Sequence, residues 1–318
     1  KFGGPEVLQV TELPIPVPKP DQVLVKLEVA GVNYSDTNWR DGIRGGNPPM
    51  VNGAEGAGTV AAVGNEVGNL SEGDRIAYWN PDIGSYAEYA VCPAFRVVKL
   101  PDEMEFETGA ALMLQGLTAH YLIRSTFEVK EGHAILFHAG AGGVGQIAIQ
   151  IAKANGAQIL VTVSSDEKAA FARNIGADQV IRYDQVDFSV ATREYTGGEG
   201  VHAVYDSVGA ATWEGSLKSL RTRGAAVYYG NSSGPLPNVD LAILAQMGSL
   251  SVVRTTLKDY VRDQEEISWR TGELFDLWRE GKLNIFVGQV YPLSEASRAH
   301  AELQARSTIG KLLLMPGS

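Results

Sequence analysis

The chain has 318 residues, enough for about two domains that each bury a core. Its 37 acidic and 27 basic residues give a formal charge of -10, which makes it a poor general-purpose binder of nucleic-acid backbones. A single cysteine excludes an intramolecular disulfide framework and a multi-cysteine zinc lobe. Glycine is frequent, at 36 residues, so the positions of the glycines are informative.

No stretch of the sequence reaches the ~18 consecutive apolar residues that a membrane-spanning helix needs, so no membrane partner is expected. The sequence opens at Lys1 without a basic-then-apolar leader, and native residues are expected to precede Lys1 because it is not a methionine. With one cysteine and no leader, a cytoplasmic location is expected.

The first hundred residues are strand-like. Segments 23–29, 59–63 and 86–91 are rich in β-formers and lie between clusters of Gly, Pro, Asn and Asp. Four alternate prolines between 14 and 20 indicate an extended, non-helical connector. These patterns predict a compact, partly barrelled β module.

The hydrophobic period changes after residue 105. Residues 107–124 are predicted to be helical, and from there to about 253 apolar strands alternate with amphipathic helices. The predicted strands are 134–137, 158–163, 179–181, 203–205, 225–229 and 250–253. This alternation predicts a doubly wound parallel sheet.

The tail of the chain has a different pattern. It is expected to contain a helix over 265–280, a strand over 286–290, a helix from 294 and a last strand over 311–315. Because the parallel sheet already has six strands, the tail is expected to return to the first module.

A glycine-rich turn follows the first strand of the alternating region. Gly140, Gly142 and Gly145 satisfy the pattern G-x-G-x-x-G between an apolar strand and a helix. They are expected to allow a tight turn, close approach of a pyrophosphate, and close packing of helix on strand. The helix N-terminus also offers unpaired N–H groups to phosphates. The turn therefore predicts a dinucleotide site.

The end of the second strand bears on the choice between NAD and NADP. An NAD enzyme usually places Asp or Glu there, where it accepts a hydrogen bond from a ribose hydroxyl. This strand ends at Ser164 and Ser165, and Lys168 follows one helical turn later, suited to a 2′-phosphate. NADPH is therefore the predicted cofactor. The alternative is that Lys168 is a solvated helix residue and Asp166 a helix cap or the ribose acceptor.

Several further motifs occur in a fixed order along the chain. The early motifs are Asn33-Tyr34-Ser35-Asp36, Arg40-Asp41-Gly42, Gly53-Ala54-Glu55-Gly56-Ala57-Gly58 and Gly73-Asp74-Arg75, followed by the Gly140 turn. In this order they resemble the motifs of the zinc-independent medium-chain dehydrogenase/reductases. The later motifs are Val204-Tyr205-Asp206-Ser207-Val208-Gly209, Trp213-Glu214 and Gly230-Asn231-Ser232-Ser233-Gly234. With these, the resemblance narrows to the bacterial NADPH:quinone oxidoreductases related to zeta-crystallin.

This resemblance implies an α/β protein with a GroES-like β-rich domain and a Rossmann domain. The GroES-like catalytic domain would comprise residues 1–117 and 257–318, and the Rossmann NADPH-binding domain residues 118–256. The resemblance also implies which residues surround NADPH. They are Gly142, Gly143 and Val144 at the pyrophosphate, Ser164, Lys168 and Tyr183 at the 2′-phosphate, Ser207 near the adenosine, Tyr229, Gly230, Asn231 and Ser232 along the nicotinamide half, and Asn33, Thr118 and Arg254 as further contacts. Many relatives carry a pocket tyrosine where this chain has Asn38, so no role of that tyrosine is transferred.

No metal site is predicted. The zinc-dependent branch carries a Cys and a His in the first two motifs, where this chain has Asn33 and Ala54, and neither an amide nor a methyl group binds zinc. The five histidines show no ligand spacing. His138 is expected to be a packed strand-end residue, and Cys92 a small buried hydrophobe.

Without a Lewis acid, the easier reaction is reduction of an acceptor that is already electrophilic. Quinones fit, and NADPH-dependent quinone reduction is the predicted activity, by hydride or by single electrons. Asn33 and Tyr34 are candidate donors to a developing oxyanion, and Tyr34 is equally well read as a packed residue of the β module. The alternatives are an NADPH-dependent enone or enal reductase, or a non-catalytic NADPH-binding protein of the crystallin or RNA-binding type. The acidic charge and the lack of basic runs disfavour nucleic acid.

Residues 250–253 are predicted to form the last strand of the parallel sheet, whose free edge would invite pairing. Relatives form homodimers across that edge, and the resemblance implies a homodimer here.

Overall fold

The computed structural model describes residues 1–317, which form two compact units. The first unit contains residues 1–117, 261–272 and those from 285 onward, and the second contains residues 118–260 and 273–284. The domain limits expected from the sequence stay a prediction. None of the helices among residues 1–317 is long and apolar enough to cross a bilayer.

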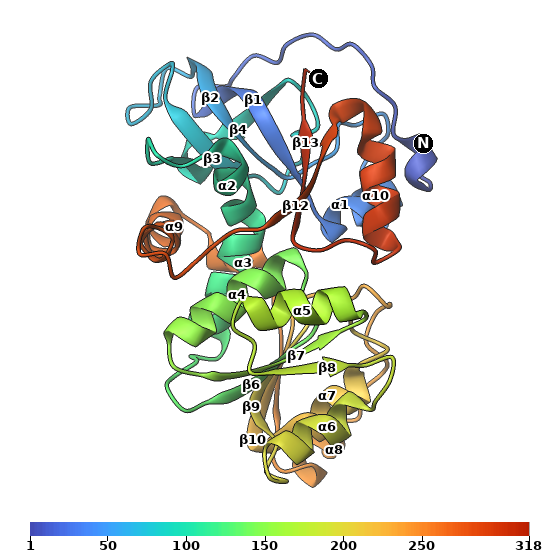
Figure 1. Cartoon of the computed structure of the whole chain (residues 1–318). Helices are drawn as coiled ribbons and strands as arrows, with labels where there is room; N and C mark the ends of the chain where they lie inside the picture. Colours follow the sequence, from blue (N-terminus) through green and yellow to red (C-terminus); the bar gives the residue numbers. More distant parts are fainter. Residues whose placement is uncertain (318) are drawn as a thin grey trace. The chain divides into compact units, whose positions relative to one another are not determined.

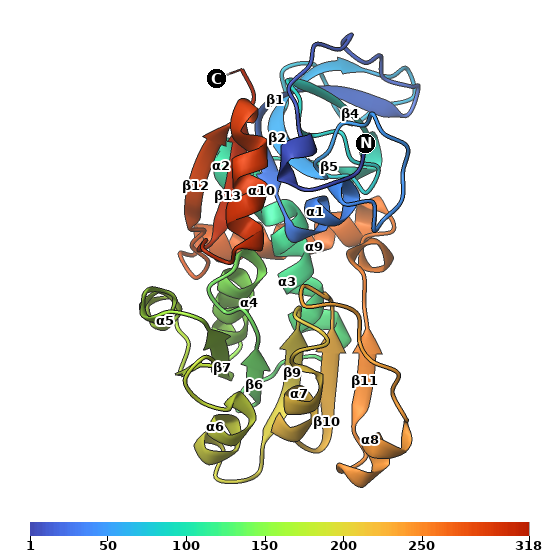
Figure 2. The same cartoon turned by 90° about the vertical axis from the view of Figure 1, so that its right-hand side faces the viewer.

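The first unit is built on a seven-stranded sheet. Its strands are β1 (Gln22–Val32), β2 (Glu55–Val63), β3 (Arg75–Trp79), β4 (Tyr89–Pro93), β5 (Val97–Lys99), β12 (Val287–Pro292) and β13 (Lys311–Met315). The strand order is β12-β13-β1-β2-β3-β5, and β4 also pairs with β1. Every pair is antiparallel except β12 with β13. Early and late segments of the chain therefore share one sheet, and Figure 2 shows β12 and β13 beside β1.

Short helices flank this sheet. They are α1 (Tyr34–Arg40), α2 (Phe106–Ala111) and α10 (Ala296–Gln304), with 3-10 turns at Pro5–Val7, Ala94–Arg96 and Leu293–Glu295. Residues 8–19 contain neither helix nor strand, as the alternate prolines predict. Alternate residues of β1, such as Val23, Val25 and Leu27, enter one buried cluster together with Ile76 and Tyr78 of β3.

The second unit contains a six-stranded sheet in the order β11-β10-β9-β6-β7-β8, and all its neighbouring strands are parallel. The strands are β6 (Ala134–Phe137), β7 (Gln158–Val163), β8 (Gln179–Arg182), β9 (Val201–Asp206), β10 (Leu220–Tyr228) and β11 (Ser251–Arg254). The helices are α4 (Gly143–Ala154), α5 (Asp166–Asn174), α6 (Phe188–Tyr195), α7 (Trp213–Ser219) and α8 (Ala242–Gln246), with a 3-10 turn at Leu257–Tyr260. The predicted α/β fold with a parallel sheet is confirmed.

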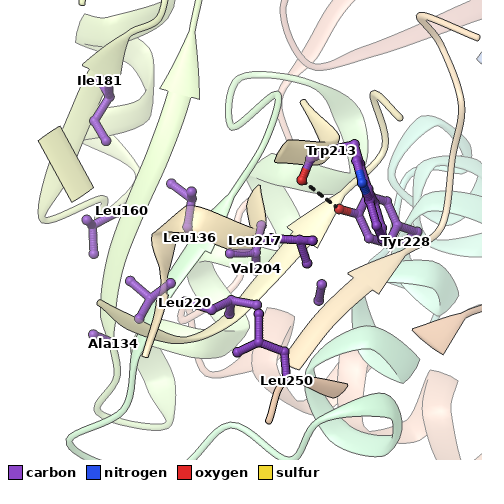
Figure 3. Close-up of a cluster of buried hydrophobic side chains, with 12 residues drawn as sticks. Ala134, Leu136, Leu160, Ile181, Val204, Trp213, Leu217, Leu220, Tyr228 and Leu250 are labelled. Atoms are coloured by element: carbon purple, nitrogen blue, oxygen red, sulfur yellow. Dashed lines mark hydrogen bonds between the residues drawn. The ribbon is translucent and has the colours of Figure 1, made fainter. Parts of the chain in front are cut away.

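Helices cover both faces of the parallel sheet. In Figure 1, α4 and α5 lie on one face, and α6, α7 and α8 lie on the other. Alternate residues of β6, Ala134 and Leu136, belong to the cluster that contains Trp213 and Leu217 of α7. Figure 3 shows this cluster, in which the Tyr228 hydroxyl donates to the Trp213 carbonyl at 3.4 Å. Apolar residues therefore fill the layer beneath α7.

The helix predicted over 107–124 is segmented. Two π-helical turns, Leu112–Gly116 and Leu122–Thr126, follow α2 and α3 (Leu117–Tyr121) respectively. At the first of these turns the Leu114 N–H donates to Glu55 Oε2 at 2.6 Å, so a side chain of β2 contacts the helix backbone where its geometry is irregular. In the tail, the expected helix over 265–280 is α9 (Gln264–Arg279).

Candidate active site

The parallel sheet of the second unit changes direction between β6 and β9. The strand order runs outward from β6 through β7 to β8 and from β9 through β10 to β11, so these two neighbours mark a topological switch point. Open parallel sheets bind ligands at the carboxyl ends of strands at such a point. The loops that follow β6, β7, β9 and β10 are therefore where a ligand is expected.

The loop after β6 presents a helix N-terminus without a side-chain cap. Gly142 is the N-cap of α4, and no side chain among residues 1–317 caps it. The first helical bond is donated by Gln146 N to Gly142 O at 2.9 Å, so the N–H groups of the preceding first turn have no helical partner. Gly142, Gly143 and Val144 are all partly exposed. This is the donor arrangement that binds a pyrophosphate.

Two of the three glycines of this loop serve needs other than those expected. The left-handed residue of the turn is Ala139, with φ 56°, and not Gly140. A Cβ on Gly140 would lie 2.6 Å from the Val161 Cβ, so glycine there permits contact with β7. A Cβ on Gly145 would lie 2.5 Å from Ala139 O, so glycine there permits contact between helix and turn. Gly142 has a single contact, at 3.2 Å, which leaves room for a ligand to approach its backbone.

The residues expected at a 2′-phosphate gather at the end of β7. Ser165 is the N-cap of α5, and its side chain accepts from Lys168 N at 3.2 Å. The Lys168 ammonium donates to Ser164 Oγ at 3.5 Å. Tyr183 follows β8, is 41% exposed, and donates its N–H to Val163 O at 3.3 Å. The structure therefore brings Ser164, Lys168 and Tyr183 to adjacent strand ends.

Asp206, the last residue of β9, organises the turn after that strand. Its Oδ1 accepts from the N–H groups of Val208 and Gly209 at 2.7 and 3.0 Å. Its Oδ2 accepts from the hydroxyls of Thr212 and Ser216 at 2.7 and 2.8 Å. The carboxylate is fully buried, so these four donors replace its hydration. Sequence reasoning treated Asp206 only as part of a motif.

His138 joins the same network and is a packed residue, as predicted. Its ring nitrogens lie 2.9 Å from Thr162 Oγ1 and 3.0 Å from Ser216 Oγ. Burial lowers the pKa of His138, although Asp206 opposes that shift. His138 therefore links β6, β7 and α7 and lies at 1% exposure, out of reach of a substrate.

The loops after β9 and β10 are joined by backbone hydrogen bonds. Ser232 N donates to Ser207 O at 3.1 Å, and Ser233 N donates to Val208 O at 2.8 Å. A Cβ on Gly230 would lie 2.5 Å from Ser207 O, so only glycine permits this approach. Burial raises the pKa of Tyr229, although its hydrogen bond with Ser207 acts in the opposite direction. The two loops thus form one continuous rim.

Three other expected contacts also lie in the second unit, one of them on this rim. Asn231 is exposed on the loop after β10. Arg254, at the end of β11, donates from Nη1 to the carbonyls of Tyr228 and Thr255 at 3.3 and 2.7 Å. Thr118 lies in α3 and is 6% exposed.

Asn33 lies in the first unit, at the centre of a buried polar cluster. Its Nδ2 donates to Glu55 Oε1 at 2.6 Å, and its Oδ1 accepts from Gln115 Nε2 at 3.0 Å and Lys311 Nζ at 3.2 Å. Lys311 also forms an ion pair with Glu55, and both side chains are fully buried. Gln115 Oε1 is buried and finds no partner among residues 1–317. The cluster holds the Asn33 amide in one orientation.

Tyr34, the other candidate donor, is the first residue of α1 and is partly exposed. Asn33 caps this helix, because its side chain and that of Asp36 each accept from the other residue's backbone in a capping box. The helix therefore fixes both candidate donors at its start.

A second buried network begins at Asp36. The Tyr86 hydroxyl lies 3.1 Å from Asp36 Oδ2 and 2.9 Å from His300 Nε2, and Arg40 Nη1 lies 3.1 Å from His300 Nδ1. Because Arg40 can only donate, His300 accepts at Nδ1 and donates at Nε2, and Tyr86 in turn donates to Asp36. Burial raises the pKa of Asp36 to about 7 and lowers that of His300 to about 3. The imidazole of His300 is therefore neutral at physiological pH.

Several of these residues were missed by sequence reasoning. Lys311 and Gln115 lay in segments interpreted only as a strand and a helix, and Glu55 was noted only within a glycine motif. A charged residue inside an apolar strand, as in Lys311-Leu312-Leu313-Leu314, is the signal that could have found one of them. Among residues 1–317, no group of three or more His, Cys, Asp or Glu side chains could hold a metal ion.

A parallel sheet with a glycine loop at its switch point, joined in one chain to a β-rich unit, defines a nucleotide-dependent dehydrogenase or reductase of the medium-chain class. Comparison with known families agrees. Residues 19–102 match the alcohol dehydrogenase GroES-like domain, and residues 143–271 match the zinc-binding dehydrogenase family.

Individual relatives narrow the class. A quinone oxidoreductase of Pseudomonas aeruginosa is 45% identical over 316 residues, covering 99% of this chain and 97% of the relative. A 2-haloacrylate reductase of Burkholderia is 38% identical over 99% of this chain and 97% of its own length. The crystal structure of Escherichia coli quinone oxidoreductase complexed with NADPH superposes with a TM-score of 0.97 at 43% identity, over 99% of this chain and 98% of that one. The chain belongs to the quinone oxidoreductase family of medium-chain dehydrogenase/reductases.

Proposed function

We propose that the chain is an NADPH-dependent quinone oxidoreductase. The observation that carries the proposal is the uncapped N-terminus of α4 at the switch point of the sheet, in a chain 45% identical to a quinone oxidoreductase. When bound, NADPH supplies the reducing equivalents.

The residues at the strand ends fit such a cofactor. The first-turn N–H groups at Gly142, Gly143 and Val144 suit a pyrophosphate, because a helix N-terminus attracts negative charge. Lys168 and Ser164 suit a 2′-phosphate, to which they offer an ammonium and a hydroxyl.

The remaining predicted contacts belong to the same proposal. The rim formed by the loops after β9 and β10 would line the cofactor. Its residues are Ser207, Tyr229, Gly230, Asn231 and Ser232, and the further proposed contacts are Tyr183, Arg254, Thr118 and Asn33.

The acceptor is reduced without a metal in this proposal. Asn33 and Ala54 occupy the two motif positions at which zinc-dependent relatives carry ligands, and an amide and a methyl group are not zinc ligands. A quinone delocalises the incoming charge itself, so the chain needs only to position it and donate hydrogen bonds. Asn33, whose orientation is fixed by Glu55 and Lys311, and Tyr34 are the proposed donors to its oxygen.

The deciding experiment is stopped-flow NADPH oxidation with a benzoquinone and with a cyclic enone, each with and without a chelator. The proposal expects faster turnover of the quinone and no loss of rate in chelator. Inhibition by chelator would refute the metal-free reaction. Faster turnover of the enone would favour the second candidate function, reduction of an activated double bond, which the relationship to the 2-haloacrylate reductase supports.

A homodimer is part of the proposal. Strand β11 is an edge strand of the six-stranded sheet, and its first and last residues are exposed, so an unpaired edge is available for a second copy. Sedimentation at micromolar concentration tests this, and a monomer there would refute it. A cytoplasmic location is proposed on the single cysteine, and fractionation of cells that express the tagged chain tests it.

A further inference from the structure

An acidic residue lies close to the position at which NAD enzymes carry their ribose acceptor. Asp166 is the first residue of α5, two serines beyond the carboxyl end of β7, and its side chain is 94% exposed. The cap of this helix is Ser165, so Asp166 is not used as a cap. A free carboxylate at this position accepts from a ribose 2′-hydroxyl and repels a 2′-phosphate. Its presence beside Lys168 therefore conflicts with a preference for NADPH.

Arg182 resolves this conflict. It is the last residue of β8 and pairs in register with Val163, the last residue of β7. Its Nη1 donates to Asp166 Oδ1, and its Nε and Nη2 donate to the two oxygens of Asp184 at 2.8 and 2.7 Å. The Arg182 side chain is only 16% exposed, although both of its partners are more open to solvent. The guanidinium is therefore held in place, with one edge committed to Asp184 and one nitrogen to Asp166.

The ion pair of Arg182 with Asp166 lies next to the proposed 2′-phosphate contacts. Tyr183 directly follows Arg182, and Lys168 lies two residues after Asp166 on the same helix. The charged groups at these two strand ends are Asp166, Glu167, Lys168, Arg182 and Asp184. Their formal charges sum to one negative, and without Arg182 the sum would be two negative. The net charge at these two strand ends thus depends on Arg182.

We propose that Arg182 is a specificity-determining residue that masks Asp166. By donating to Oδ1 of the carboxylate, it occupies one of the two oxygens that could accept from the ribose hydroxyl of NADH, and its charge lessens the repulsion of the 2′-phosphate of NADPH. This inference rests on the proposed function, because it explains how a chain with an NAD-type acid takes NADPH. Arg182 acts through Asp166 and need not touch the phosphate.

The test measures equilibrium binding of NADPH and of NADH without an acceptor, by the fluorescence of the reduced nicotinamide. The proteins are the full chain, R182Q, D166N and the double variant. R182Q is expected to raise the Kd for NADPH about fivefold, which is the size of effect that loss of a partly exposed ion pair allows. The Kd for NADH is expected to stay the same or to fall. In the D166N background, R182Q is expected to change the Kd for NADPH less than twofold, because there is no carboxylate to mask.

Glu167 provides a matched control. It is the next residue of α5, is exposed, and carries the same charge. E167Q removes one negative charge from the same helical turn, and R182Q is expected to weaken NADPH binding as strongly in the E167Q background as in the unaltered chain.

The outcomes separate the inference from the proposed function. If R182Q weakens NADPH binding equally with and without D166N, then Arg182 binds the phosphate directly and the inference that it masks Asp166 is wrong. No loss from R182Q would also overturn it. If the unaltered chain itself binds NADH as tightly as NADPH, the proposed cofactor fails and the mask fails with it.

Discussion

Replacing Lys311 by methionine tests the buried ion pair of the first unit. Lys311 and Glu55 are both fully buried, and the ammonium also lies 3.4 Å from Val32 O and 3.2 Å from Asn33 Oδ1. K311M keeps the length of the side chain and removes its charge. The Glu55 carboxylate then keeps two donors, from Leu114 N and Asn33 Nδ2, and loses the only cation that forms an ion pair with it among residues 1–317.

An uncompensated buried charge of this kind costs about 3–5 kcal/mol. Most of the cost comes from the remaining carboxylate, so removing that charge as well is expected to recover most of it. The double variant K311M/E55Q should therefore be more stable than K311M alone. The coupling between the two sites should exceed about 1 kcal/mol, as for residues in direct contact.

The assay must report on the first unit separately, because a chain with two units need not unfold in one step. Amide hydrogen exchange in increasing urea, followed peptide by peptide, gives the opening free energy of β1 and β13 directly. K26M is the matched control, since Lys26 lies on β1 and is exposed, and it should change stability by less than about 0.5 kcal/mol. A K311M protein as stable as K26M, or a double variant as unstable as K311M, would refute the reasoning.

Three further predictions follow from the geometry. Burial raises the pKa of Asp36 from 3.8 to about 7, so in the folded chain this carboxyl keeps a proton that the unfolded chain releases. The free energy of unfolding should therefore fall between about pH 4 and 7, by up to about 1.4 kcal/mol per pH unit. The D36N variant should flatten this fall, as measured by urea titrations at each pH. G145A places a Cβ 2.5 Å from Ala139 O and should raise the Kd for NADPH about tenfold with α4 still protected from exchange. D206A leaves four donors without their acceptor and should destabilise the second unit by about 2–4 kcal/mol. Amide hydrogens in the turn after β9 should exchange faster. Unchanged exchange in that turn would contradict the role of Asp206 in organising it.

The layered fold was predictable because it depends on local periodicity. Apolar runs of four to six residues alternating with amphipathic segments specify parallel strands and helices, and the glycine pattern marks the loop at the first strand end. The role of Gly142 was predictable from the pattern, but those of Gly140 and Gly145 were not, because they depend on which atoms pack beside each residue in the fold. Gly140 is required by Val161 of β7, and the left-handed conformation falls on Ala139.

The polar clusters could not be predicted from the sequence, for a related reason. Glu55 and Lys311 are 256 residues apart, and only the pairing of β1 with both β2 and β13 brings them together. Similarly, Asp166 read in isolation is a candidate ribose acceptor, and its partner Arg182 becomes visible only when β7 and β8 are in register. Charge at a site can be counted from sequence, but its pairing cannot.

The pairing of β13 with β1 also constrains the order in which the chain can fold during synthesis. The second unit has been made completely by Asn284, before β12 and β13 of the first unit, so it can fold while the ribosome is still translating. The first unit cannot be completed at that time, because Val32 and its neighbour Lys311 are 279 residues apart. Until β13 emerges, the end of β1 around Ala30 is an open strand edge and Glu55 has no cation. Slow translation of the last segment should therefore expose the nascent chain to aggregation at the strand made first.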